Sequence, residues 1–143
     1  MSSETEPAAE MVFRQFETLP EEPVSKMTVA GDQGWTRVMV SKAINGSPDI
    51  FASVFRMEPN MYHPMHAHPN VGELYFVIKG RVQMTVGGHT EWCEPGTAIY
   101  TPQDVPHCAR TDDQGASVLV IFPEGDWEKV GKRWIETEGE ADG

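Results

Sequence analysis

Short runs in which apolar and polar residues alternate follow one another along most of this chain. The alternation has the two-residue period of a half-buried strand, and helical periodicity is weak almost everywhere. Turn residues separate the runs, among them the Gly87-Gly88 pair expected of a two-residue hairpin turn. The pattern predicts strands over residues 35–40, 50–57, a stretch ending at 68, 73–78, 81–86, 89–93, 97–101, 107–110 and 116–122. One helical turn is expected near residues 126–130.

These strands leave no room for crossover helices between them, so the sheets that they form must be antiparallel. The fold class is therefore all-β, and a closed barrel or a jelly roll deals best with the strand edges. The 13 glycines and 11 prolines fit many short strands joined by tight turns. With 143 residues and no internal repeat, the chain is expected to hold one such barrel over residues 23–125.

Acidic residues are concentrated at the two ends of the chain. Residues 1–22 carry six acidic side chains and one basic one, and residues 124–143 carry seven and three, within a total net charge of −11. We expect an acidic N-terminal tail and lead-in segment over 1–22, and a C-terminal segment with an acidic tail over 126–143. No basic stripe is present that could neutralise phosphates, so nucleic-acid binding is not expected.

The two cysteines, Cys93 and Cys108, are too few for a disulfide framework. The acidic N-terminus lacks the basic-then-apolar order of a signal peptide, and the longest apolar runs are far too short for a membrane span. The sequence therefore predicts a cytoplasmic protein with free thiols and no membrane contact.

The predicted strand over residues 73–78 is apolar on both faces. Glu73, Tyr75 and Val77 share one face, and the residues between them share the other. We expect the first face to point inward, and the second to pack against another sheet or a second subunit.

Candidate chemistry is concentrated in the histidines. His66 and His68 are two residues apart, so on a strand they project from the same face and can converge on one ion. Glu73 opens the next antiparallel strand, and His107 begins another one across the barrel. Three imidazoles and one carboxylate leave coordination positions open, as a reactive metal site requires. His63 has the opposite parity and is expected to face away, unless Pro64 resets the alternation.

The same residues carry a family resemblance. Residues 60–80, NMYHPMHAHPNVGELYFVIKG, resemble the first cupin motif, G-x5-H-x-H-x3–4-E-x6-G, and residues 96–111 resemble the second, G-x5-P-x-G-x2-H-x3-N. Asn60, Asp104 and Thr111 stand where the motifs have Gly, Gly and Asn. These departures fall at turn or terminal positions, and Asn and Asp tolerate positive φ better than most residues. The resemblance implies a double-stranded β-helix, or jelly-roll, cupin barrel.

The resemblance also implies one divalent metal ion held by His66, His68, Glu73 and His107, with Fe(II) favoured and Mn, Ni, Zn, Cu or Co as alternatives. It suggests a homodimer and a small-molecule substrate. Tyr75 lies on the inward face beside these ligands, where it would be either a catalytic phenol or a wall of the lumen. Four arginines could each recognise an anionic substrate or lie on the surface: Arg37, Arg56, Arg81 and Arg110.

Three functions fit this interpretation. The first hypothesis is a non-haem Fe(II) dioxygenase that acts on a chelating phenolic, thiol or dicarbonyl compound. The second is a non-redox lyase or isomerase with Tyr75 as its base, since the order of the motifs is similar to that of cupin dimethylsulfoniopropionate lyases. The third is a small-molecule-binding cupin without catalysis.

Overall fold

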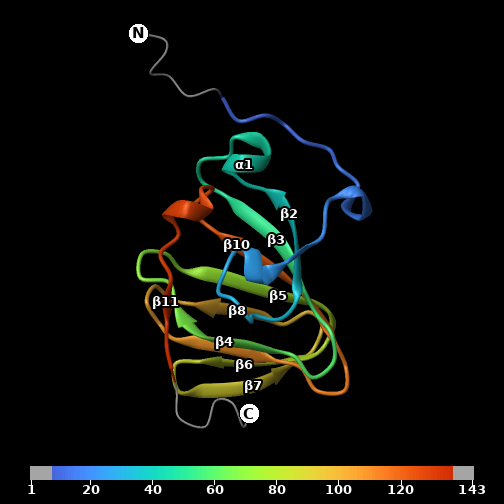
Figure 1. Cartoon of the computed structure of the whole chain (residues 1–143), viewed down its shortest axis with the longest axis vertical. Helices are drawn as coiled ribbons and strands as arrows, with labels where there is room; N and C mark the ends of the chain where they lie inside the picture. Colours follow the sequence, from blue (N-terminus) through green and yellow to red (C-terminus); the bar gives the residue numbers. More distant parts are fainter. Residues whose placement is uncertain (1–7, 137–143) are drawn as a thin grey trace.

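Residues 8–136 are described by a computed structural model, in which two antiparallel sheets face each other (Figure 1). The first sheet has the order β1-β2-β3-β10-β5-β8, with bounds Glu22–Pro23, Trp35–Val40, Phe51–Met57, Ala116–Phe122, Glu73–Gly80 and Ala98–Thr101. The second has the order β11-β4-β9-β6-β7, with bounds Arg133–Trp134, Tyr62–Ala67, His107–Arg110, Val82–Val86 and His89–Cys93. The predicted all-β jelly-roll class is confirmed, and it consists of these two antiparallel sheets.

Among residues 8–136, helical structure is confined to single turns. They are η2 (Phe16–Thr18), η3 (Val24–Lys26), α1 (Lys42–Asn45) and η4 (Trp127–Lys129). The Ser41 hydroxyl accepts a hydrogen bond from the Ile44 amide at the start of α1, and Gly46 ends it in the left-handed conformation. The helical turn expected near 126–130 is thus present as η4.

The core lies between the two sheets. Strands β5 and β10 alternate strictly between more and less buried positions along most of their length, as the two-residue period requires. Buried side chains of both sheets meet there, including Met57, Val77, Val82 and Phe122. The outer face of β5 behaves differently: Leu74, Phe76 and Ile78 are 37–48% exposed, so no other sheet within residues 8–136 covers them.

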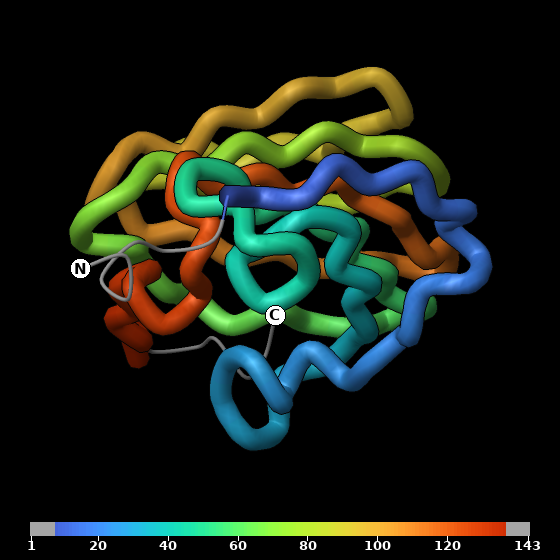
Figure 2. Tube along the Cα trace, turned by 90° about the horizontal axis from the view of Figure 1, so that it is seen from above, coloured from blue at the N-terminus to red at the C-terminus, as the bar shows by residue number. Residues whose placement is uncertain are grey.

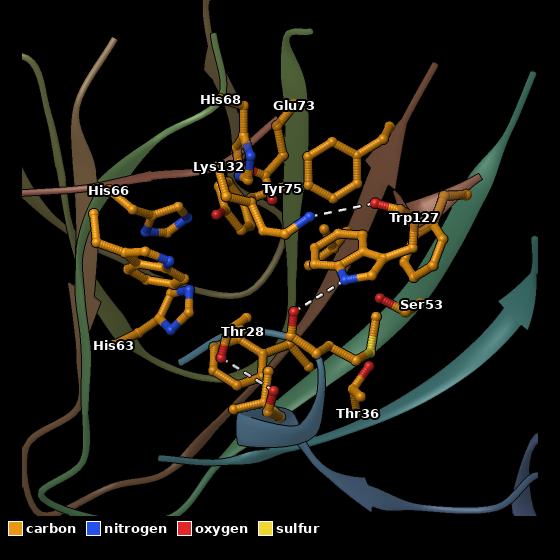
Figure 3. A pocket seen from close by; sticks show the side chains of 17 residues that line it. Thr28, Thr36, Ser53, His63, His66, His68, Glu73, Tyr75, Trp127 and Lys132 are labelled. Carbon is orange, nitrogen blue, oxygen red and sulfur yellow. Dashed lines mark hydrogen bonds and ion pairs between the residues drawn. The ribbon is translucent and has the colours of Figure 1, made fainter. Parts of the chain in front are cut away.

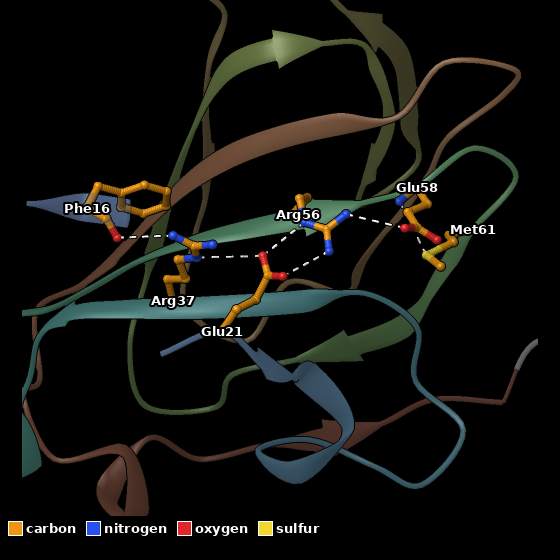
Figure 4. Close-up of polar contacts among 6 residues, drawn as sticks. All are labelled: Phe16, Glu21, Arg37, Arg56, Glu58 and Met61. Atoms are coloured by element: carbon orange, nitrogen blue, oxygen red, sulfur yellow. Dashed lines mark hydrogen bonds and ion pairs between the residues drawn. The ribbon is translucent and has the colours of Figure 1, made fainter. Parts of the chain in front are cut away.

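The segment that precedes β2 is tied to the outside of the first sheet. Figure 4 shows Glu21 between two arginines of neighbouring strands, with its carboxylate 2.9 Å from Arg56 Nε and 3.7 Å from Arg37 Nε. The hydrogen bond from Arg56 is the main reason that the pKa of Glu21 lies below its ordinary value. Seen from above, the following segment around residues 24–34 forms a loop at the rim of the molecule (Figure 2, light blue).

The C-terminal segment folds back over the sheets as a strap, which we define as residues 127–134. Trp127 packs against the rings of Phe51 and Phe122, and its indole N–H donates to the main-chain oxygen of Met27. Strand β11 then pairs with β4, which places Trp134 opposite His66. The predicted acidic tails extend into 1–7 and 137–143, which lie outside the described residues. No helix among residues 8–136 is long and apolar enough to cross a membrane.

Candidate metal centre

Four side chains with metal-binding donor atoms converge at one end of β4, β5 and β9. They are His66, His68, Glu73 and His107. His66 lies opposite His107 in the β4–β9 ladder, His68 follows β4 by one residue, and Glu73 opens β5. Their donor atoms all lie within 4.8 Å of one another, and all four residues are buried. The structure therefore brings together the four residues that the sequence nominated as ligands.

Each of the three imidazoles is oriented by a main-chain carbonyl. The Nδ1 atoms lie at hydrogen-bonding distance from the oxygens of Pro64 for His66 (2.8 Å), Gly131 for His68 (2.8 Å) and Val105 for His107 (3.0 Å). A carbonyl oxygen only accepts, so Nδ1 carries the proton and the neutral ring presents its Nε2 lone pair. All three rings are thus fixed in the tautomer that binds a metal through Nε2.

The donor atoms face one another without hydrogen bonds. Glu73 Oε1 lies 3.0 Å from His107 Nε2 and 3.3 Å from His68 Nε2. These three atoms are buried, and none has a hydrogen-bond partner. In the Nδ1-protonated tautomer, lone pairs therefore point at a carboxylate oxygen, an arrangement that is costly unless a cation lies between them. The donor set fits a divalent metal ion.

Burial and neighbouring charge shape the protonation of these ligands. Burial, followed by the charges of His63 and His107, lowers the pKa of His66 to about 2. His66 is therefore held in the deprotonated form that a metal ligand requires.

Tyr75 lies on the inward face of β5, with its ring centroid 6.0 Å from that of His107. Burial, followed by the charge of Glu73 and a hydrogen bond to it, raises the pKa of Tyr75 well above its ordinary value. The chain alone therefore favours the neutral phenol, which donates a hydrogen bond rather than accepting a proton.

His63 faces the same cavity as the four ligands, so the stated exception applies: the alternation is reset at Pro64. In the β4–β9 ladder His63 pairs with Ala109 and His66 with His107, so β4 carries one more residue than β9 between the two pairs. This bulge at Pro64 and Met65 reverses the parity and brings the His63 and His66 rings to 4.8 Å.

His63 is paired with an aspartate that sequence reasoning missed. The Nδ1 atom of His63 lies 2.9 Å from Asp32 Oδ1, and Asp32 also accepts from the Thr28 hydroxyl and the Gln33 amide. The Asp32 side chain is fully buried. Asp32 lies in a loop 31 residues before its partner, and no spacing rule links the two positions.

A small cavity of about 50 Å³ opens beside these groups (Figure 3). Its wall is largely aromatic, with rings from Phe51, Phe55, Phe122, Trp127 and Trp134. Its polar lining consists of Thr28, Thr36, Ser53, His63, His66, His68, Glu73, Tyr75 and Lys132. The strap forms part of the wall of this cavity, since three of its side chains line it.

None of the four arginines named above lines the cavity. Arg37 and Arg56 contact Glu21, Arg81 pairs with Asp112, and Arg110 donates to Gln83. Sequence reasoning missed Lys132, the cation that does line it. Lys132 follows the last predicted strand, and nothing in the sequence indicates that the chain after this strand folds back to the cavity.

Comparison with known proteins agrees with this architecture. The family model described as "Cupin domain" matches residues 53–122, which include all four candidate ligands. An oxalate decarboxylase of Arthroderma benhamiae is 29% identical over 103 residues, which cover 68% of this chain and 24% of that protein. The two curated relatives that match are covered over only 48% and 24% of their lengths.

Solved structures show the same fold at low identity. The polyketide cyclase RemF from Streptomyces resistomycificus superposes with a TM-score of 0.74 at 22% identity, covering 92% of this chain and 89% of RemF. A DMSP lyase superposes with a TM-score of 0.62 at 20% identity, covering 72% of this chain and 53% of the lyase. The chain thus contains a small domain of the cupin superfamily, with a His/Glu cluster able to bind a metal ion.

Proposed function

We propose that the protein is a metal-dependent enzyme that moves a proton on a small substrate without net oxidation, as a lyase, isomerase or cyclase does. The observation that carries the proposal is the His63–Asp32 pair, which lines the same cavity as the four donor atoms. Proton abstraction needs a base beside the substrate, and a histidine oriented by an aspartate supplies one.

His66, His68, Glu73 and His107 would hold the ion. A divalent ion there would act as a Lewis acid and polarise a carbonyl or carboxylate oxygen of the substrate.

The chain's own residues then supply the proton transfer. Asp32 accepts from His63 Nδ1, which fixes the tautomer in which Nε2 is free to take a proton. The Thr28 hydroxyl and the Gln33 amide hold the Asp32 carboxylate in place. In this scheme Tyr75 remains protonated and orients the substrate as a donor, so His63 replaces it as the proposed base.

A non-haem Fe(II) dioxygenase remains the second candidate. Three imidazoles and a carboxylate beside an aromatic cavity suit a chelating phenolic, thiol or dicarbonyl substrate. This reaction consumes O₂ and requires Fe(II), whereas proton transfer also proceeds with zinc and without oxygen.

The deciding experiment begins with elemental analysis of protein purified without chelator, with a His66→Ala/His107→Ala double variant as control. The Zn(II) and Fe(II) forms are then incubated in D₂O with a panel of small β-dicarbonyl compounds. We expect anaerobic deuterium incorporation with Zn(II), detected by NMR, and its loss in His63→Asn, whose amide can still donate to Asp32. Uptake of O₂ by the Fe(II) form alone would establish the dioxygenase instead. Binding of metal and ligand without either reaction would support the third hypothesis, a small-molecule-binding cupin without catalysis.

We also propose that two copies associate through the outer face of β5 and β8. Leu74 pairs with Tyr100 across these strands, and both side chains are exposed together with Phe76 and Ile78. Light scattering should give twice the chain mass, and Phe76→Lys should shift it toward the mass of one chain. An unchanged mass in this variant would rule out this face.

A further inference from the structure

The cavity has a single basic side chain other than histidine. Among the described residues that line it, Lys132 is the one lysine or arginine, and Glu73 is the one acid. Glu73 belongs to the candidate metal centre, so Lys132 supplies a positive charge that no acid of the lining neutralises. Lys132 lies outside both cupin motifs and comes from the strap.

The Lys132 ammonium is held in one place by the strap itself. Its Nζ donates to the main-chain oxygens of Val130 at 2.7 Å and Trp127 at 3.3 Å. It also lies 4.2 Å from the centroid of the Trp127 ring, and Figure 3 shows it directed toward that residue. Carbonyl oxygens only accept, so this environment suits the protonated amine.

Lys132 has no carboxylate partner within residues 8–136, whereas Lys26 and Lys42 pair with Glu22 and Asp126. Burial lowers the pKa of Lys132, and no acidic neighbour raises it again. A half-buried cation without a counterion is costly, and an anionic ligand in the cavity would remove that cost. The 3.3 Å contact with Trp127 is the weaker of its two hydrogen bonds, so this donor can be exchanged for a ligand oxygen.

We infer that Lys132 is a specificity-determining residue that binds an anionic oxygen of the substrate, while a second oxygen of the same substrate faces the metal centre. The inference rests on the proposed function, because it takes the four-donor cluster to hold a metal ion. The substrate class is a small anion with two oxygen groups, such as a dicarboxylate or a keto acid. A cavity of about 50 Å³ with aromatic walls leaves room for only a short apolar spacer between the groups.

The test uses Zn(II)-loaded full-length protein and calorimetric titration with acetate, malonate, succinate and glutarate. We expect at least one dicarboxylate to bind ten-fold or more tightly than acetate. Lys132→Met should remove that advantage and leave acetate affinity within two-fold. Lys129→Met removes an exposed lysine of the same strap and controls for overall charge; it should bind all four probes as the wild type does.

Three further outcomes separate the possible failures. A wild-type protein that takes up no zinc would overturn the proposed function itself. Protein that binds zinc but shows no dicarboxylate advantage, or keeps it in Lys132→Met, would overturn the role of Lys132 alone. An equal loss in Lys129→Met would assign the effect to bulk charge. Lys132→Arg, which retains the charge, should keep part of the dicarboxylate advantage and serves as the readout if Lys132→Met does not fold.

Discussion

Asn60 and Asp104 adopt a left-handed backbone conformation at two tight turns, with φ of 58° and 62°. These are two of the positions where the cupin motifs have glycine, and Asn and Asp are the residues that best tolerate such angles. The main-chain N–H of Asn60 also donates to the main-chain oxygen of Asp112. The departures from the motif therefore preserve the turn.

The Asn60 turn gives a prediction about stability. Asn60→Gly should change the free energy of unfolding little, because glycine adopts positive φ without strain. Asn60→Ala should lower it by about 1 kcal/mol, because alanine tolerates positive φ less well than asparagine does. Urea denaturation of the two variants measures the difference. Equal stabilities would mean that the backbone angle at residue 60 carries no strain.

Glu73→Gln should have opposite effects on the stability of the metal-free protein and on zinc affinity. In metal-free protein at pH 8, Glu73→Gln places an amide donor beside the unpaired Nε2 atoms of His68 and His107, and should raise stability by about 1 kcal/mol. The same change removes the charged ligand, so zinc affinity should fall at least about ten-fold. Thermal unfolding and competitive zinc titration measure the two effects. A variant destabilised without metal would contradict the proposed arrangement of lone pairs.

The sequence could predict the four donors because their spacing follows the strand period and two motifs. It could not predict the orientation of His63, because a bulge reverses parity without changing the pattern of apolar and polar residues. Asp32 and Lys132 could not be predicted for a related reason. Asp32 pairs with a residue 31 positions away, and Lys132 binds main-chain oxygens, which any residue type provides.

Among the elements, the strap has the most direct link to the metal centre. The Asn70 side chain donates to the Lys129 carbonyl and accepts from the Gly131 amide, each at 2.7 Å. The Gly131 carbonyl then accepts from His68 Nδ1. A Cβ atom at residue 131 would lie 2.7 Å from Asn70 Oδ1, so this close approach requires glycine.

Asn70→Ala should therefore act on both stability and metal binding. We expect a loss of about 1–2 kcal/mol in the free energy of unfolding from the two hydrogen bonds. Zinc affinity should fall about ten-fold, because the carbonyl that orients His68 is no longer held. Gln103→Ala is the matched control, since the Gln103 side chain donates a hydrogen bond to the Pro69 carbonyl of the same turn rather than to a residue of the strap. Equal zinc affinity in both variants would mean that the strap does not influence metal binding.

The strands themselves were largely predictable from sequence. The observed bounds of β2, β7, β9 and β10 coincide with the predicted ranges, because turn residues bracket each run of alternating residues. The strap was expected only as a C-terminal segment over residues 126–143 with one helical turn near 126–130. Its path is set by single hydrogen bonds to distant residues, which no periodicity reveals.

At the scale of the whole molecule, acid should destabilise the metal-free protein through its buried centre. His66 has a folded-state pKa of about 2 against an ordinary value of 6.5. Its contribution to stability is fully present above pH 6.5 and is lost as the pH falls, because the unfolded chain takes up a proton that the folded chain refuses.

The expected slope from His66 is up to about 1.4 kcal/mol for each pH unit below 6.5. Urea unfolding of chelator-treated protein at pH 8, 6 and 5 measures it. His66→Gln should lose up to about 2 kcal/mol less than the wild type between pH 8 and 5, because only the folded wild type excludes that proton from residue 66. His89→Gln, at an exposed histidine, should follow the wild type. If all three proteins respond equally to acid, the loss comes from the general acidity of the chain, and the buried imidazole is not its cause.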